Sequence, residues 1–555
     1  MKKLMIFGGL AAASLVALSD TVIEKDVVIY GSSPAAISAA ISAQRLGRSA
    51  VIVSPEKRIG GLTTGGLGQT DIGNKAAFGG LALQFYRDVA AYYRDAANWK
   101  WQKREEYKPM GQCRGSLAAD SMWTFEPHAA LDILLRWEKD EKLDIRRDEW
   151  LDRGKGGVTV EKGRITSLRT LSGKVFRGRM FVDATYEGDL MAAAGVSYFV
   201  GREDNSVYGE TISGFQPAPK YCGHKLEKGI DPYRVKGDPK SGLLPGVKPY
   251  EYVKNRRVGQ GDNQMQAYNI RMCLTDVSEN RIPFAKPEGY DEGEYELLFR
   301  QAEAGVDLTK RNQGLMPNRK TDTNNHGGFS TDFIGRNWEW PEASYETRAK
   351  LFRAHLVYQQ GLMWTLANHP RIPEYVRKEF SRWGTCKDEF LDGPGDGWQS
   401  QLYVREGRRL VGDVVMTEHH CRGSRKVARP VAMGAYGMDS HNGLRYVGAD
   451  GFVHNEGDIQ DYVAADGKGR FPPFGIDYGA VVPKRGECAN LFVPVCLSAS
   501  HMAFGSIRME PVFFALGQVA GTAAAQAIAA GCDVQDLPYA PLRERLLADG
   551  QVVER

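Results

Sequence analysis

The chain has 555 residues, of which 42% are hydrophobic and 25% are charged, and its formal net charge is +4. This length exceeds that of one simple domain, and the composition is ordinary for a globular protein, so we expect two domains. Because the charge is close to neutral and no long basic block is present, nucleic acid is not an expected partner.

The first 19 residues have the pattern of a secretory signal peptide. Lysines at positions 2 and 3 precede an apolar run over residues 4–18, and small residues at 17 and 19 suit cleavage before Asp20. The run is short for a permanent membrane span. We therefore predict an exported protein, periplasmic or secreted, without stable membrane insertion.

The next segment predicts a strand, a tight turn, a helix and a second strand. The apolar runs Val27–Tyr30 and Ala50–Val53 are typical of buried parallel strands, and helical spacing runs from Ala35 to Leu46 before Gly47. In such a unit the pyrophosphate of a dinucleotide lies on the helix N-terminus. Of the usual G-x-G-x-x-G pattern only the first glycine is present. The candidate cofactor contacts in this turn are Gly31, Ser32, Ser33, Pro34 and Ala35.

A second candidate phosphate contact follows the second strand. Residues 58–61, RIGG, resemble the R-x-G-G element of glutathione-reductase-type flavoproteins, in which the glycines let the backbone approach the FAD pyrophosphate. An acid usually ends this strand and accepts the ribose hydroxyls, but Ser54 stands there and Glu56 comes two residues later. We expect the glycine-rich stretch 62–73 to be a loop on the cofactor. The candidate contacts are Ser54, Glu56, Arg58, Gly60, Gly61, Leu62 and Thr63.

Periodicity places the elements of the middle of the chain. It predicts helices at 80–93, 126–138, 345–367 and 371–383, and a hairpin at 158–165. A strand at 181–185 returns to the cofactor half, with Ala184, Thr185 and Asp189 as candidate contacts, although Asp189 could simply cap a helix. From 211 to 479 Pro, Gly, Asn and Trp are frequent, which indicates a loop-rich inserted domain.

The C-terminal segment returns to the cofactor fold. We predict a strand at 490–497, a turn at 498–511 and a small-residue helix at 512–530. A helix N-terminus and a nearby arginine would stabilise the charge of a reduced flavin, which makes Gly505, Ser506, Arg508 and Met509 candidate contacts. The predicted class is α/β: a signal peptide at 1–19, a Rossmann-like FAD-binding domain at 20–210 and 480–555, and an inserted α+β substrate domain at 211–479.

These motifs together resemble the bacterial secreted FAD-dependent oxidoreductase family, whose glutathione-reductase-type FAD-binding fold is split between the chain ends. The resemblance covers nearly all of the mature chain and implies FAD and oxidoreduction, without naming a substrate. The matching segments are GSSPA at 31–35, RIGGL at 58–62, VDATYEGDL at 182–190, YVREGRR at 403–409, MDSHN at 438–442, VPKRGE at 482–487 and, most specifically, residues 500–511.

Hydride transfer to flavin N5 generally needs a base for the substrate proton and a cation that holds the substrate. His501 is our first candidate for the base, and a structural histidine is the alternative. Arg405 and Arg408 could bind a carboxylate or hydroxyl-rich substrate, or could belong to an internal Glu–Arg network. His326 and His441 are loop histidines that suit a pocket.

No metal site is predicted. The pair His419-His420 beside Cys421 lacks partners at a ligand spacing, and none of the eight cysteines forms a C-x-x-C pair. The cysteine spacing reveals no disulfide pattern, and buried free thiols are an equally good interpretation.

The sequence therefore predicts an exported FAD-dependent oxidoreductase acting on a small polar organic substrate, such as a sugar derivative or a hydroxy acid. Oxygen, a quinone or a cytochrome would accept the electrons. Two alternatives stay open: an FAD-containing isomerase, hydratase or lyase without net redox, and a non-catalytic carbohydrate-binding protein on the same fold.

Overall fold

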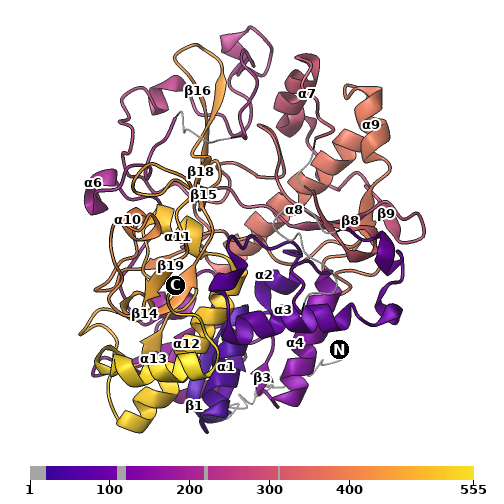
Figure 1. Cartoon of the computed structure of the whole chain (residues 1–555). Helices are drawn as coiled ribbons and strands as arrows, with labels where there is room; N and C mark the ends of the chain where they lie inside the picture. Colours follow the sequence, from indigo (N-terminus) through magenta and orange to yellow (C-terminus); the bar gives the residue numbers. More distant parts are fainter. Residues whose placement is uncertain (1–20, 109–119, 218–222, 311–312) are drawn as a thin grey trace, which may run out of the picture.

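A mixed sheet in the lower part of the molecule joins the two ends of the chain (Figure 1). The computed structural model describes residues 21–108, 120–217, 223–310 and 313–555, so the predicted signal peptide lies outside the described residues. Within this part the strand order is β3-β2-β1-β6-β5-β4, and β20 pairs with β6. The strands are β1 (Val22–Tyr30), β2 (Ala50–Val53), β3 (Ile145–Arg146), β4 (Val158–Glu161), β5 (Arg164–Arg169), β6 (Val175–Asp183) and β20 (Leu491–Phe492).

The register of the parallel strands brings the candidate turns to one edge of the sheet. Tyr30, the last residue of β1, lies opposite Val53 of β2 and Asp183 of β6. Because these strands run in the same direction, the turns that leave them meet at their carboxyl ends, where α/β sheets bind dinucleotides. The predicted hairpin is present as β4 and β5, and it extends the sheet beyond β6.

Helices pack on this sheet from both halves of the sequence. The described helices here are α1 (Pro34–Arg45), α3 (Gly80–Tyr92), α4 (Pro127–Asp140), α5 (Asp189–Ala193), α12 (Glu510–Ala530) and α13 (Tyr539–Ala548). A Cβ on Gly517 would lie 2.3 Å from the carbonyl oxygen of Ala35, and one on Gly521 would lie 2.1 Å from that of Ala39. Glycine thus allows the backbones of α1 and α12 to touch. Helix α12 is long and apolar enough to cross a membrane, but 89% of its apolar window is buried in the fold.

Three sequence predictions near the site are wrong in local structure. The predicted turn at 498–511 contains α11 (His501–Ile507), which begins where the Ser500 side chain accepts the Ala503 N–H. Gly505 does not break this helix; a Cβ there would lie 2.4 Å from the carbonyl oxygen of Asp439, so the glycine serves close packing. The predicted loop at 62–73 begins inside a short helix, α2 (Gly61–Thr64). The predicted strand at 490–497 is reduced to the two residues of β20.

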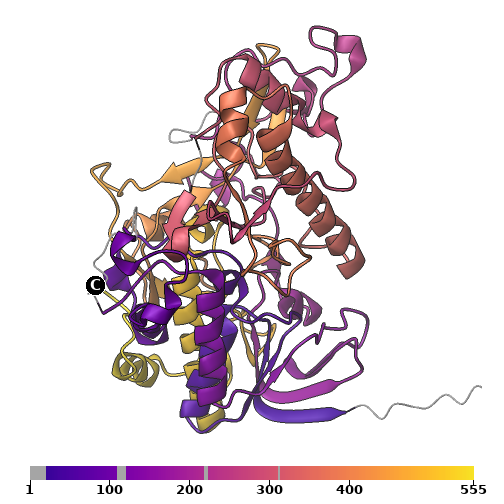
Figure 2. The ribbon, with the colours of Figure 1, turned by 90° about the vertical axis from the view of Figure 1, so that its right-hand side faces the viewer.

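The inserted part forms the upper body in Figure 2. Its antiparallel sheet has the order β10-β11-β8-β12-β9. The strands are β8 (Met272–Thr275), β9 (Arg281–Pro283), β10 (Gln313–Met316), β11 (Lys320–Thr323) and β12 (Gly384–Cys386), and the helices are α7 (Glu296–Glu303), α8 (Tyr345–Asn368) and α9 (Glu374–Phe380). The predicted helices in this part are therefore present, the second one shortened.

Four short strand pairs form separate two-stranded sheets outside the two larger sheets. They are β7 (Tyr198–Phe199) with β13 (Arg409–Leu410), β14 (Pro430–Gly434) with β19 (Phe474–Asp477), β15 (Met438–Ser440) with β18 (Ile459–Asp461), and β16 (Leu444–Val447) with β17 (Val453–Glu456), accompanied by α6 (Asn205–Tyr208) and α10 (Glu418–Cys421). Strand β14 packs on α12, and the Tyr539 hydroxyl donates to the carbonyl of Pro430 at 2.8 Å. Residues that we predicted to be in the inserted domain thus pack against the C-terminal helices. The α/β class itself is confirmed.

Candidate cofactor and active site

The turn after β1 forms one wall of a phosphate cradle. Gly31 has a φ of +127°, and a Cβ there would lie 2.5 Å from the backbone of Ala184, in the turn after β6. The Ser33 hydroxyl donates to the Ala184 carbonyl at 2.6 Å and does not cap α1. The N-terminus of α1 therefore lacks a side-chain cap, which suits it to an anionic group such as a pyrophosphate.

The R-x-G-G turn forms the facing wall. The Gly60 N–H donates to the Ser32 carbonyl at 2.7 Å, and a Cβ on Gly61 would lie 3.0 Å from the Cα of Ser33. Both glycines have positive φ values, 86° and 50°, which few other residues adopt. The structure therefore brings together the two turns that the sequence analysis predicted as phosphate contacts.

Tyr186 and Glu510, which the sequence analysis did not name as site residues, complete this wall. The Leu62 N–H donates to the Tyr186 hydroxyl at 2.9 Å, and the Thr63 hydroxyl donates to Glu510 at 2.7 Å. The Tyr186 hydroxyl in turn donates to Glu510 at 3.0 Å. Burial raises the pKa of the Glu510 carboxyl to about 7. Glu510 is the first residue of α12, so its hydrogen bond with Thr63 links the R-x-G-G wall to the helix N-terminus that we expected near the flavin.

A cavity of about 580 Å³ opens beside the cradle. Residues that line it include Tyr30, Glu56, Arg58, Thr185, Glu187, Asp189, Trp340 and Arg348. The Ser54 hydroxyl donates to the backbone carbonyl of Glu56 at 2.6 Å, whereas the Glu56 carboxylate accepts the Ser32 hydroxyl at 2.5 Å. Of the two candidates for the ribose contact, Glu56 is therefore the one that lines the cavity. Burial raises the pKa of this carboxyl to about 7.

FAD affinity is expected to fall as the pH drops below 7. The ribose hydroxyls of FAD would donate to ionised Glu56, so protonation of this carboxyl opposes binding and raises Kd by up to ~tenfold per pH unit. Titration of the cofactor-free protein with FAD between pH 5 and 8 measures the effect. Glu56→Gln should flatten the profile, and Glu346→Gln, on the surface, should leave it unchanged. An unaltered profile in Glu56→Gln would assign the pH dependence to another group.

Asp189 is the centre of a buried ion network at the same cavity. Arg348 contacts its two carboxylate oxygens at 2.6 and 2.9 Å, and Arg408 donates to it at 2.9 Å. Burial would raise the pKa of Asp189, but these guanidinium groups, Arg348 foremost, hold it below the usual value. Arg408, which we predicted to act on the substrate, thus lies on the cofactor side, and the structure does not bring it together with His501.

His501 is held at both ring nitrogens. Its Nδ1 lies 2.8 Å from Glu406 and its Nε2 lies 3.0 Å from the Ser440 hydroxyl, and the side chain is buried. Burial would raise the pKa of Glu406, but His501 and Arg409 lower it to about 2. These contacts leave neither nitrogen free for a substrate, which favours a structural role for His501.

Three arginines surround the ring of Tyr403. The guanidinium carbons of Arg405, Arg271 and Arg508 lie 4.5, 5.5 and 5.9 Å from the ring centroid. Arg508 donates to the Tyr403 hydroxyl at 2.9 Å and to Asp439 at 2.5 Å. Among the described residues the Nε atoms of Arg405 and Arg508 have no hydrogen-bond partner. The structure therefore brings two predicted site arginines together, each with an unused buried donor.

His441 joins the carboxylates that pair with these arginines. Its Nδ1 lies 2.8 Å from Asp332, which also pairs with Arg405 at 3.0 Å, and its Nε2 lies 3.5 Å from Asp439. The ring of His224 is stacked on His441 with centroids 6.4 Å apart, and His326 lies 6.3 Å from His224. Three histidines therefore form a row that ends in this buried cluster.

A second cavity, which we call the inner cavity, lies at the end of the row formed by His326. It measures about 250 Å³ and is lined by Met272, Thr323, Asn324, His326, Thr331 and Met363, among others. The Asn324 side-chain oxygen accepts from Arg405 at 3.2 Å. This inner cavity thus adjoins the arginine and histidine cluster, and it places His326 at a pocket, as the sequence analysis expected.

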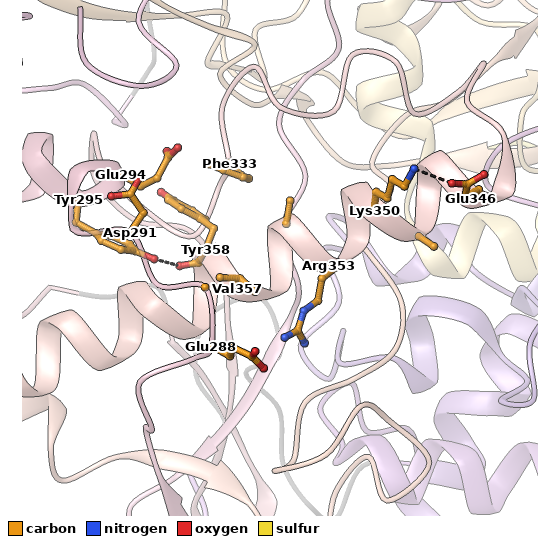
Figure 3. A pocket seen from close by; sticks show the side chains of 13 residues that line it. Glu288, Asp291, Glu294, Tyr295, Phe333, Glu346, Lys350, Arg353, Val357 and Tyr358 are labelled. Carbon is orange, nitrogen blue, oxygen red and sulfur yellow. Dashed lines mark hydrogen bonds and ion pairs between the residues drawn. The ribbon is translucent and has the colours of Figure 1, made fainter.

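Two other features do not belong to this site. A groove of about 750 Å³ lies along α8 and residues 288–295, and Figure 3 shows its lining side chains, including Arg353 and the Lys350–Glu346 ion pair at 2.7 Å. It is lined by none of the predicted site residues.

The second feature outside this site is a cluster of two buried glutamates and a histidine. Glu126, His128 and Glu389 have ligand atoms within 4.8 Å of one another, a spacing that would suit a metal ion. The Lys320 ammonium lies 2.9 Å from Glu126 and 2.7 Å from Glu389, so a side-chain cation already occupies the centre of the cluster. Sequence reasoning missed it because its residues come from three distant parts of the chain, at 126–128, 320 and 389.

Comparison with known proteins agrees with this geometry. The sequence model described as FAD dependent oxidoreductase matches residues 26–546. No curated protein matches this chain.

Similar solved structures include a flavin monooxygenase from Stenotrophomonas maltophilia (18% identity over 32% of this chain and 41% of that one, TM-score 0.18). A 3-ketosteroid dehydrogenase from Rhodococcus jostii is 14% identical over 33% and 50%, with a TM-score of 0.20. A bacillithiol disulfide reductase from Staphylococcus aureus is 13% identical over 38% and 48%, with a TM-score of 0.18. The chain thus covers half or less of each structure, and these TM-scores support no statement on activity.

The family match runs through both walls of the phosphate cradle and through α12. An uncapped helix N-terminus, two glycine turns in contact and an adjoining cavity with a carboxyl for the ribose fit FAD. The predicted cofactor, FAD, and the predicted enzyme class are thereby confirmed: the chain belongs to the FAD-dependent oxidoreductase family.

Proposed function

We propose that the protein is exported and that it oxidises or reduces a small polar organic substrate, such as a sugar derivative or a hydroxy acid. The observation that carries the proposal is the inner cavity of about 250 Å³, whose polar wall at Asn324 is bonded to Arg405. A cavity of this size holds a small molecule, and amide, hydroxyl and imidazole groups on its wall suit hydroxyl or carboxylate groups.

Bound FAD supplies a hydride acceptor or donor at N5. The protein supplies a base and a cation. His441 takes the proton of the substrate hydroxyl at Nε2, because Asp332 holds its Nδ1 at 2.8 Å while Nε2 has only a long contact of 3.5 Å with Asp439. Arg405 holds the substrate through its unused Nε–H, and Asp332 fixes the orientation of both side chains. This assignment replaces His501 by His441 as the base.

The proposed electron acceptor follows from the proposed location of the protein outside the cytoplasm. The segment 1–19 has the features of an export signal, and nicotinamide is scarce outside the cytoplasm. Within the described residues one parallel sheet has the dinucleotide topology, and FAD uses it. We therefore propose oxygen, a quinone or a cytochrome as the acceptor.

The test is the visible spectrum of the purified protein during an anaerobic substrate screen. Oxidised flavin should bleach when the correct sugar derivative or hydroxy acid is added, and oxygen or a quinone should restore its colour. Turnover of a substrate without bleaching would favour an isomerase, hydratase or lyase. A protein that cannot be loaded with FAD would favour a binding protein.

His441→Gln is expected to reduce kcat by about 10² to 10⁴-fold while the protein keeps its FAD, because glutamine has the size of histidine but cannot accept the proton. Stopped-flow measurement of flavin bleaching checks this. The control is His454→Gln, because His454 is partly exposed and its ion pair within the described chain is with Asp450, at 2.9 Å, away from the predicted site residues. A variant with normal bleaching would remove His441 from the chemistry.

A further inference from the structure

Two buried cysteines face each other in the sheet of the inserted part. Cys273 lies on β8 and Cys386 on β12, and both are fully buried. The antiparallel register pairs Gly384 with Thr275 and Thr385 with Leu274, so the next pair in the ladder is Cys386 with Cys273. Their sulfur atoms are 3.7 Å apart.

This position has the geometry that a disulfide needs. Opposite residues of antiparallel strands have Cα atoms about 4.5–5.5 Å apart, which lies within the ~4.4–6.8 Å range of disulfides. A change of side-chain rotation would therefore join the sulfur atoms without moving the strands. The other four described cysteines, Cys421, Cys488, Cys496 and Cys532, have no sulfur atom in contact with another sulfur in the described structure.

The surroundings of the pair give the thiols no other chemistry. Met316 and Phe390 pack with both cysteines in a small apolar cluster. Burial raises the pKa of both thiols, so they are poor nucleophiles in the folded protein. A catalytic or metal-binding thiolate is therefore disfavoured here, and a structural crosslink remains.

We propose that Cys273 and Cys386 form a disulfide that links β8 to β12 in the mature protein. Each thiol loses one proton and the pair loses two electrons to a disulfide oxidant, which is reduced to two thiols. The oxidant is a thiol–disulfide oxidoreductase or a low-molecular-weight disulfide. The bond forms before the sheet closes, because both sulfur atoms are inaccessible afterwards. This inference rests on the exported location in the proposed function, but not on the flavin chemistry.

The crosslink would stabilise one wall of the active site. Met272, next to Cys273, lines the inner cavity, and Arg271 pairs with Asp322 and lies over the Tyr403 ring. On the other strand, Cys386 is followed closely by Glu389, which holds Lys320. A covalent bond between β8 and β12 therefore fixes the cavity wall relative to the buried ion cluster.

Peptide mapping of FAD-loaded protein from an oxidising compartment tests the proposal. The protein is denatured with iodoacetamide and digested with trypsin without reductant. We expect residues 272–281 and 383–387 as one linked species, which separates into two peptides after reduction. Dithiothreitol should cleave the link in denatured protein at least ~tenfold faster than in folded protein, because the bond is buried. Recovery of both peptides alkylated and unlinked would overturn the proposal.

Variants separate this inference from the proposed function. Cys273→Ser should remove the linked species and lower Tm by about 3–5 °C, whereas Cys532→Ser should leave both unchanged. Should Cys273→Ser fail to fold, the map of the wild-type protein still decides. Protein refolded from the reduced state with glutathione disulfide should form the same link. If the protein is not exported, the linked species would be found in this refolded protein but not in protein purified from cells. Absence of the link from the refolded protein as well would refute the pairing, whatever the flavin does.

Discussion

Gly31→Ala is expected to abolish retention of FAD. The new Cβ would lie 2.5 Å from the carbonyl carbon and oxygen of Ala184, so the turns after β1 and β6 must separate. The φ of +127° adds backbone strain, because residues with a side chain rarely adopt it. Since these turns form one wall of the phosphate cradle, we expect FAD affinity to fall at least ~100-fold and the free energy of unfolding to fall by roughly 2–4 kcal/mol. Flavin content after gel filtration and urea unfolding measure the two effects.

Gly47→Ala is the matched control. Gly47 also has a positive φ, +73°, but a Cβ there would meet nothing within 4 Å. Its substitution tests strain without a clash, and we expect a cost of about 1 kcal/mol with full flavin content. If Gly31→Ala and Gly47→Ala behaved alike, contact between the two turns would have no part in cofactor binding.

Lys320→Met is expected to destabilise the protein by about 3–5 kcal/mol, the usual cost of leaving buried charges without their partner. The ammonium of Lys320 contacts Glu126 and Glu389 at 2.9 and 2.7 Å, and the three side chains are buried. Methionine fills a similar volume without the charge, so the loss comes mainly from the carboxylates. Urea unfolding followed by tryptophan fluorescence measures it.

The defect of this variant should grow with pH. Burial raises the pKa of Glu126 even beside Lys320, and loss of the cation would raise it further above its unfolded value near 4.3, whereas Glu389 keeps its contact with His128 at 2.6 Å. A carboxyl with a raised pKa contributes stability below the unfolded pKa, and this stability is lost as the pH rises through the folded pKa. The difference from wild type should therefore be smaller at pH 5 than at pH 8. Lys350→Met, which breaks an exposed ion pair with Glu346, should cost less than about 0.5 kcal/mol at either pH. A pH-independent defect would place the loss in packing.

The cradle was predictable because its determinants are local. A glycine at position 31 followed by small residues, and two glycines at 60 and 61, indicate close backbone approach whatever lies elsewhere in the chain. The contact between Ser33 and Ala184 could not be read in this way, since the residues are 151 positions apart. The sequence indicated which backbone must come close, but not what it would meet.

The roles of the polar residues were less predictable for a related reason. Arg405 and Arg408 are three positions apart, yet one pairs with Asp332 and the other with Asp189. Residues 402–408 have neither helical nor strand structure, so no periodicity fixes which way successive side chains point. Glu510 and Tyr186 were missed because their importance comes from each other and from Thr63, far away in the sequence.

The division of the cofactor fold between the chain ends determines when the protein can acquire FAD. Helix α1 is made first, but the helix that covers it, α12, begins at residue 510, and β20 joins the sheet only from residue 491. A growing chain that has reached residue 480 thus has the cradle turns but neither α12 nor Glu510. Stable cofactor capture is therefore expected only after these elements have been made, and a chain that ends before residue 491 should be colourless. A stable flavin colour would thus report that residues 491–530 have been made and have packed on the N-terminal part of the sheet.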